Sequence, residues 1–513
     1  MQKLYLLSLA CCLLFACSDL VEDLSADDVR VDAEYALPLV DSRVNLPGLL
    51  GEIDENVTLT VDPDGLLRFN YTDTVPSVTG EALFAELRAL GRVLPLPITS
   101  RSRTIPFPLP GDVDLNVLRL KAGRFTYSLP NTYARPVSVT LTFPTLTREG
   151  EPLQVSGNLP AYSGSGTPPT LTNASAPVDL TGYALDFTAG SVTVNYAIDG
   201  TDGEALEPAD GTIAVLSNLD FSYLEGYFGL QRYPGVNDVL AIDFFDNYLG
   251  GDISFVKPRI TVTVRNSFGV PSRAVIDNLF ITTVDGDTMA VEGAVVTDGF
   301  DFDYPTAPGS NRFTDYVVDE TNSNVLDLIS AKPVALHYQI SALINPDEDA
   351  SIDGFLVDTS SYAATLNVEL PLYGAADDFR MRDSFPVNLG DQYGDVTAAT
   401  LRVTTDNEIP FDLSLTGTFI DAAGNAVADL TDGELLLIEG SPVDAAGNAD
   451  GSRQVTTDIP FTGDALTAIR RASFLVLETT FATTGDGIRQ PVRVTDDQQL
   501  RVRIGARLSV QNN

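Results

Sequence analysis

The segment RITVTVR, residues 259–265, alternates apolar and polar side chains without a break. This period-two alternation is typical of a β-strand with one buried and one solvent-exposed face. Residues 137–143, 413–419 and 500–504 follow the same pattern, and groups of Asp, Gly, Asn and Pro separate such segments. These groups favour hairpins and tight turns. The sequence therefore predicts an all-β fold of several antiparallel β-sandwich units.

Helical patterns are short and few. Residues 81–90 (EALFAELRAL) form one amphipathic segment, and residues 324–330 and 464–471 are candidates for one or two helical turns. No alternation of strands with long helices is present, which argues against a parallel α/β sheet. We therefore expect only a few short helices.

Three predicted strands end in a similar turn. Asn131, Asn266 and Asn407 each follow a strand, and a proline comes five, five and three residues later. Asparagine tolerates the left-handed turn conformation, and proline fixes the direction in which the chain re-enters the next strand. This corner resembles those of the late-embryogenesis-abundant, water-stress-type and other immunoglobulin-like β-sandwich modules. The resemblance implies about three sandwiches in a row, and the alternative is three unrelated turns.

Loop-rich stretches suggest how the chain divides. Residues 163–178, 201–211 and 305–310 are rich in Pro, Gly and Ser or in acidic residues, a composition typical of loops. A chain of 513 residues is expected to form more than one domain. We expect an elongated array of three β-rich units, listed by residue range as 34–200, 201–330 and 331–513.

The first twenty residues, MQKLYLLSLACCLLFACSDL, contain an apolar run over residues 4–15. That run is too short to span a bilayer and is typical of a signal peptide. It ends in LFAC at residues 14–17, which resembles a bacterial lipoprotein lipobox. The resemblance implies that residues 1–16 are removed and that Cys17 carries diacylglycerol and palmitate. Phe15 departs from the smaller residue usual at its position, and the alternative is a generic secretory signal.

Cysteine usage agrees with a lipid anchor. The chain has three cysteines, Cys11, Cys12 and Cys17. Cleavage before Cys17 leaves a single cysteine, and the lipid would occupy it. An exported protein of this kind would contain no disulfide.

An acidic tract, SDLVED, follows at residues 18–23. It resembles the surface-export signal of Bacteroidetes-type lipoproteins, and the alternative is an ordinary acidic tether. With residues 17–33 as the tether, the resemblance implies a lipid-anchored protein of the outer membrane, on its extracellular face.

The net charge is −40, from 71 acidic and 31 basic residues. This charge argues against binding nucleic acid, because few cations are left to neutralise phosphates. It argues equally against docking on an anionic membrane face.

Residues suited to catalysis are scarce. The one histidine, His337, falls on the polar side of a predicted strand and is expected to be a surface or edge residue. The chain contains no Gly-x-Ser-x-Gly, Walker A or His-Glu-x-x-His motif. The sequence therefore predicts a protein without catalytic activity and without a cofactor.

Calcium is the one metal that the composition makes worth weighing, because it binds converging oxygen ligands in turns. Asp301 and Asp303 share one side of an extended segment, and Asp347 and Asp349 lie in a second acidic segment. Solvated acidic turns are the alternative for both segments.

The densest aromatic region covers residues 221–248. Tyr223, Tyr227, Phe228 and Tyr233 are its candidate ligand-binding residues, and the alternative is that the region fills a core between sheets. Separately, Asp-Thr-Val and Asp-Thr-Met resemble the O-glycosylation pattern of Bacteroidetes-type exported proteins. The candidate acceptors are Thr74 and Thr288.

Three functions remain open at this point. The first is a non-catalytic, lipid-anchored envelope protein that acts as a binding or scaffold module, with an envelope protein complex or a glycan as partner and no nucleic acid. The second is a carrier of lipid or another hydrophobic ligand in a sandwich or tubular cavity. The third is a glycosidase that uses two carboxylates alone.

Overall fold

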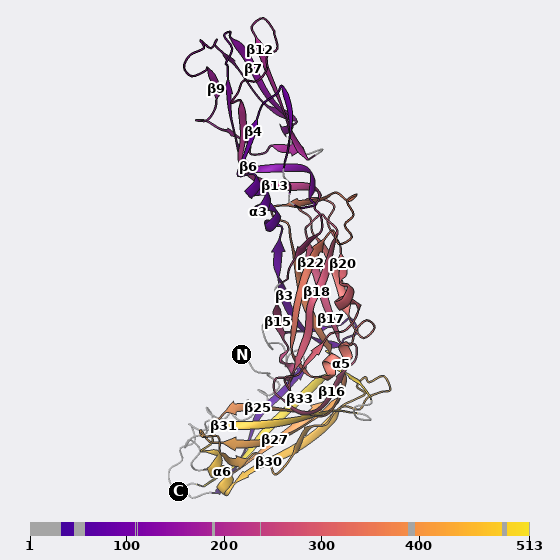
Figure 1. Cartoon of the computed structure of the whole chain (residues 1–513). Helices are drawn as coiled ribbons and strands as arrows, with labels where there is room; N and C mark the ends of the chain where they lie inside the picture. The colour runs from indigo at the N-terminus through magenta and orange to yellow at the C-terminus, as the bar shows by residue number, and fades with distance from the viewer. Residues whose placement is uncertain are drawn as a thin grey trace.

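The computed structural model describes residues 32–45, 57–107, 109, 111–186, 190–235, 237–387, 396–484 and 490–511. All strand pairs reported among them are antiparallel. Four short α-helices occur in these residues, so the predicted all-β class is confirmed. Figure 1 shows an elongated molecule in which three groups of strands follow one another along its length.

We call the three groups the tip, middle and base units. The tip unit lies at the top of Figure 1 and the base unit at the bottom, where the C-terminus also lies. Their strands fall in five sheets, of which two form the middle unit and two form the base unit. The tip unit is built from one sheet of eleven strands. In this sheet, β11 (Ala184–Asp186) pairs with both β6 (Asp114–Pro130) and β7 (Val137–Arg148).

The middle unit shows the strand arrangement most clearly. In its first sheet, β17 (Arg259–Asn266) lies between β24 (Ser361–Pro371) and β21 (Arg312–Val318). The chain then crosses to the second sheet, where β18 (Ser272–Thr283) pairs with β22 (Pro333–Ile344). Each sheet presents alternate side chains to the space between them, because successive residues of a strand point to opposite faces.

The base and tip units repeat this pairing. In the base unit, the central strand β26 pairs with β33 and β30, and the next strand β27 pairs with β31. In the tip unit, β6 pairs with β13 and β9, and β7 pairs with β12. The bounds are β26 (Val396–Asn407), β33 (Gln499–Gln511), β30 (Arg453–Thr462), β27 (Phe411–Ile420), β31 (Phe474–Thr483), β6 (Asp114–Pro130), β13 (Ile213–Tyr227), β9 (Thr170–Thr172), β7 (Val137–Arg148) and β12 (Ser191–Gly200).

Shorter elements complete the units. The helices are α3 (Glu81–Leu90), α4 (Ala294–Asp298), α5 (Val325–Ser330) and α6 (Gly463–Ile469), with a 3₁₀ turn η1 (Asp243–Phe245). Helices α3, α5 and α6 occupy the three segments predicted to be helical. The remaining strands are β2 (Val57–Val61), β5 (Ser102–Pro106), β8 (Glu151–Leu159), β10 (Val178–Asp179), β14 (Gln231–Tyr233), β15 (Asp238–Ala241), β16 (Tyr248–Phe255), β19 (Thr288–Ala290), β20 (Phe300–Phe302), β23 (Gly354–Val357), β25 (Tyr373–Pro386), β28 (Ala426–Asp429), β29 (Leu435–Ile438) and β32 (Val492–Arg493).

Three early strands are distributed one to each unit. β1 (Asp32–Asn45) pairs with β33 in the base, β3 (Leu67–Thr79) with β24 in the middle, and β4 (Val93–Pro97) with β13 at the tip. The chain thus passes from base to tip, builds most of the tip unit, and returns through the middle unit to the base. On the return, β16 pairs with β25 of the base and β23 pairs with β13 of the tip. The sheets therefore cross the limits at residues 200 and 330 that the loop composition suggested, because a strand's partner is chosen by tertiary contacts.

The three predicted asparagine corners share one geometry. Asn131, Asn266 and Asn407 are fully buried, with 0% exposure each. The side-chain oxygen of each accepts a bond from the backbone N–H two residues later, at 2.9, 2.8 and 3.0 Å. The side-chain nitrogen donates to a carbonyl oxygen on a distant segment, namely that of Pro160, Asp303 or Glu439, at 2.8, 3.1 and 3.0 Å. Each amide therefore ties the corner between two sandwich strands to another part of the same unit.

Replacing Asn266 by Asp tests this corner. The carboxylate cannot donate to the carbonyl oxygens of Phe268 and Asp303 and adds a charge to a dry site. We expect the substitution to lower the free energy of unfolding of the middle unit by about 2–4 kcal/mol. Calorimetric unfolding of the full chain measures this change. Asn278→Asp, at an exposed position of β18, is the matched control, and an equal effect of both variants would contradict the proposed role of the corner.

Candidate functional site: an apolar cavity between the middle and base units

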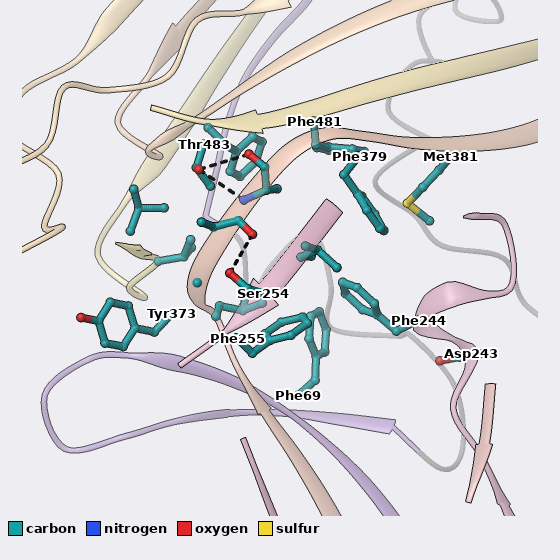
Figure 2. A pocket seen from close by; sticks show the side chains of 18 of the residues that line it. Phe69, Asp243, Phe244, Ser254, Phe255, Tyr373, Phe379, Met381, Phe481 and Thr483 are labelled. Atoms are coloured by element: carbon teal, nitrogen blue, oxygen red, sulfur yellow. Dashed lines mark hydrogen bonds between the residues drawn. The ribbon is translucent and has the colours of Figure 1, made fainter. Parts of the chain in front are cut away.

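The end of the middle unit meets the base unit through elements from several parts of the chain. β16, which follows the 3₁₀ turn η1, pairs with β25 of the base unit. β3 contributes Phe69 and Tyr71 from the middle unit, and β31 contributes Phe481 and Thr483 from the base unit. Figure 2 shows Phe69, Phe481 and Thr483 around a common space.

The space is a cavity of about 190 Å³. Almost all of its walls are apolar, and eight of the nineteen residues that line it are aromatic. Its aromatic and sulfur-containing lining residues are Phe69, Tyr71, Phe244, Phe255, Tyr373, Phe379, Met381, Phe411 and Phe481. Cavities that bind small molecules are typically apolar and often lie between domains.

Phe244 of η1 is at the centre of the aromatic wall. Its ring centroid lies 4.9 Å from that of Phe245, 5.6 Å from Phe255, 5.9 Å from Phe69 and 6.2 Å from Phe379. Contacts at these distances, edge-on or offset, are favourable arrangements of aromatic rings. Through this one residue, η1 packs against β3, β16 and β25 at the same time.

Two hydroxyl groups at the cavity are bonded to the backbone of β25. Ser254 Oγ donates to the carbonyl oxygen of Ala375 at 3.5 Å. Thr483 Oγ1 accepts the N–H of Ala376 and donates to its carbonyl oxygen, both at 3.3 Å. These bonds are drawn as dashed lines in Figure 2. Because these hydroxyls are engaged by the protein, the cavity favours a hydrocarbon group over a polar one.

The acidic group of the wall is Asp243. Burial raises the pKa of Tyr71 well above its usual value, and the charge of Asp243 and a hydrogen bond to it raise that pKa further. Burial and then the charge of Asp243 also raise the pKa of Asp246. Tyr71 therefore stays protonated and donates a hydrogen bond to the Asp243 carboxylate. The charge of Asp243 thus has a partner within the protein.

The predicted ligand residues of the aromatic region lie elsewhere. Tyr223 stacks on Phe355 with ring centroids 6.3 Å apart, and its hydroxyl donates to Glu225 at 2.5 Å. Burial, followed by this bond, raises the pKa of Tyr223 to about 12. Tyr227 is half-buried on β13. None of these side chains lines the cavity.

Phe228 and Tyr233 belong to the packed interior. Phe228 is fully buried, and Tyr233 stacks on Phe268 with ring centroids 6.1 Å apart. Within residues 221–248, Phe244 lines the cavity whereas Phe221 and Phe245 are buried. The region thus contributes buried rings to the core and one ring, that of Phe244, to the cavity wall, and ligand binding by the region stays a prediction.

The acidic calcium candidates are engaged in other contacts. Arg273 binds Asp301 at 2.6 Å and lies 3.5 Å from Asp347. Asp349 accepts bonds from the backbone and hydroxyl of Ser351, which lower its pKa. Asp303 is exposed beside Asp301. The described residues contain no group of three or more His, Cys, Asp and Glu side chains placed to hold a metal ion.

His337 is half-buried on β22. Its ring stacks on Phe280 with centroids 4.5 Å apart, and Nε2 lies 2.9 Å from the hydroxyl of Thr282. Thr74 and Thr288, the glycosylation candidates, are both exposed.

The predicted signal peptide, residues 1–16, and the lipidation candidate Cys17 lie outside the described residues. No helix in the described part of the chain is both long and apolar enough to cross a bilayer.

The cavity was missed from the sequence because its walls come from separate segments. Phe69, Phe379 and Phe481 are far apart in the chain and stand in strands of ordinary composition. The adjacent pair Phe244–Phe245 was the one local signal, as part of the aromatic region.

Comparison with known proteins does not name a family. No family model matches the chain, and no curated protein matches it. Among solved structures, a "putative secreted protein" from Parabacteroides distasonis has a TM-score of 0.27 and 14% identity, covering 57% of this chain and 89% of its own. A structure of infectious bursal disease virus, Gx strain, has a TM-score of 0.14 and 9% identity, covering 90% of this chain and 82% of its own. Scores this low carry no argument about function.

Replacing Phe244 by Ala tests the role of the aromatic wall. The substitution removes a ring that contacts four others, and we expect the unfolding free energy to fall by about 2–4 kcal/mol. Calorimetry of the full chain is the measurement. Phe313→Ala is the control, since Phe313 is 63% exposed; a loss at Phe244 no greater than that at Phe313 would show that the wall does not hold the units together.

Proposed function

We propose that the protein is a lipid-anchored, non-catalytic rod of the outer membrane that presents its tip unit to a binding partner at the cell surface. The observation that carries the proposal is the path of the chain. β1 begins at Asp32, which is paired with Gln511 in the base unit. The predicted tether, residues 17–33, overlaps the start of β1 and would therefore join the base. The tip would be the part farthest along the rod from the anchor (Figure 1).

The lipobox-like LFAC sequence and the acidic tract support the anchor and the export. The repeated asparagine corner supports a relationship of the three sandwiches to water-stress-type and immunoglobulin-like modules. Loops at the ends of sandwiches commonly carry binding residues, and the tip unit has an exposed loop at residues 163–166. A glycan or an envelope protein complex is the proposed partner.

Lipid attachment is tested by Cys17→Ala. Cells grown with a palmitate analogue should label the wild-type protein and not the variant, and the variant should leave the membrane fraction. Cys12→Ala is the matched control, because it removes a thiol within the signal peptide and should leave labelling intact. Labelling of the Cys17→Ala protein would refute the anchor.

Surface display is tested by inserting a specific protease site into residues 163–166. Addition of the protease to intact cells should cut the tip loop. Cleavage only after the outer membrane is broken would place the rod in the periplasm and would contradict the surface assignment. A cytoplasmic marker protein, monitored in the same samples, shows that the cells stay intact.

A second candidate function is favoured by the cavity. Apolar cavities of about 150 Å³ bind molecules the size of benzene, and the cavity between the middle and base units has about 190 Å³. This volume suits a ring or the end of an alkyl chain, so the protein would be a carrier of a small hydrophobic ligand or of one segment of a lipid.

Carrier activity is tested with N-phenylnaphthylamine, an apolar fluorescent probe. Ala376→Leu should fill the cavity and weaken probe binding about tenfold, which corresponds to about 1.4 kcal/mol. Ala363→Leu, at a half-exposed position of β24, is the matched control. Since Ala376→Leu could unfold the junction, native mass spectrometry of the wild-type protein supplies a second measurement. Absence of both probe binding and a co-purified apolar ligand would overturn the carrier function.

A further inference from the structure

The outer face of the base sheet formed by β1, β33, β26 and β30 is rich in arginine. β33 carries Arg501, Arg503 and Arg507, which alternate with the buried residues Val502, Ile504 and Ala506. The alternation puts all three arginines on the solvent side of the sheet. The whole chain has only 31 basic residues against 71 acidic ones, so such a group is unusual in this molecule.

Two arginines of this face are neutralised by carboxylates. Arg501 forms a bidentate ion pair with Asp41, with hydrogen bonds of 2.9 and 2.8 Å. Arg402 on β26 binds Asp458 in the same way, with both bonds at 2.7 Å. These pairs fix the positions of two guanidinium groups on the sheet.

Arg503 and Arg507 differ from their neighbours. Within the part of the chain that the structure describes, neither forms an ion pair with a carboxylate. The Nε atom of Arg503 is enclosed by protein and has no hydrogen-bond partner there. A buried donor without a partner is costly, and the Arg503 guanidinium lacks the carboxylate acceptor that Arg501 and Arg402 each have.

Gly505 lies between these two arginines on β33 and creates a hollow in the sheet surface. It pairs with Arg402 on β26 and with Pro38 on β1. The hollow has a volume of about 480 Å³ and is bordered by three arginines, Arg402, Arg503 and Arg507. The carboxylates of Asp41 and Asp458, which pair with Arg501 and Arg402, also line it. At about 3.4 Å per residue, the Cα atoms of Arg503 and Arg507 are roughly 14 Å apart, so their long side chains can approach one group from opposite sides.

The arrangement matches the chemistry of a phosphoryl group. Guanidinium groups donate paired hydrogen bonds to phosphate oxygens, and the planar fork gives these bonds a defined direction. A tetrahedral group with several charged oxygens can accept from more than one arginine at once, whereas a carboxylate has only two oxygens. We propose that the hollow at Gly505 binds the phosphoryl group of a phosphate ester, either a free one or a lipid headgroup.

The net charge of −40 does not prevent this binding. Charges farther away than about 8 Å are largely screened at physiological ionic strength. Among the charges that line the hollow, the three arginines outnumber the two carboxylates, Asp41 and Asp458. The proposal does not depend on the lipid anchor or on the apolar cavity, since it concerns a separate face of the base unit.

The first experiment is titration calorimetry of the full chain with glycerol phosphate. Replacement of Arg503 and Arg507 together by Gln should weaken binding at least tenfold. Gly505→Leu should have a similar effect by filling the hollow. The fold should tolerate this substitution, because a Cβ atom at residue 505 would meet only the carbonyl oxygen of Leu37, at 3.5 Å.

Arg265→Gln is the matched control. Arg265 lies on β17 of the middle unit, where it bonds to Asn311 at 3.1 Å, and its replacement changes the net charge by one unit without touching the hollow. Phosphate binding should be unchanged in this variant. Equal weakening by Arg265→Gln, or no weakening by the substitutions at the hollow, would overturn the proposal.

The source of the phosphoryl group is decided by vesicle flotation. Vesicles of phosphatidylcholine with phosphatidylglycerol are compared with phosphatidylcholine alone. Binding to the anionic vesicles that is lost in the Arg503/Arg507 variant assigns a lipid headgroup. Binding of glycerol phosphate without vesicle binding assigns a free phosphate ester. Failure to bind either, or binding of an acidic peptide in their place, would refute a phosphoryl site.

Discussion

The buried asparagine at the end of one strand in each unit is the contact on which the three sandwiches depend. Its amide accepts one backbone bond and donates others, so a single side chain satisfies groups on two chain segments. A carboxylate cannot donate these bonds and a hydroxyl is too short to span them. An unmet polar group in such a corner costs about 1–3 kcal/mol, which explains why the same residue occurs at all three corners.

The three units are connected by strands that pair with partners far along the chain. β1, β3 and β4 each add one strand to a sheet completed much later in the sequence. The chain crosses each junction between units more than twice, because β16 joins a base sheet and β23 joins the tip sheet between strands of the middle unit. Several crossings resist twisting and separation better than one linker, and both ends of the described chain lie in the base unit.

The candidate sites arise from two different features of the same sandwiches. The apolar cavity forms where the end of one sandwich meets the side of the next and aromatic rings from both pack around Phe244. The arginine hollow forms on a single sheet, where a residue without a side chain interrupts a row of long basic ones. The first site needs two units in contact, whereas the second needs only the pairing of four strands in the base.

The sequence by itself determined the strand class, three short helices and the repeated asparagine corner, because each depends on residues within a few positions of one another. Alternation at residues 259–265 and the Asn266 turn are examples of such local patterns. It did not reveal the apolar cavity, to which separate segments contribute Phe69, Phe244 and Phe379. The partners of β1 and β3 also depended on tertiary structure. Residues hundreds of positions apart make these contacts, and no local sequence pattern indicates such a pairing. The physical reason is that hydrogen bonding and periodicity define a strand, while only packing decides which strands meet.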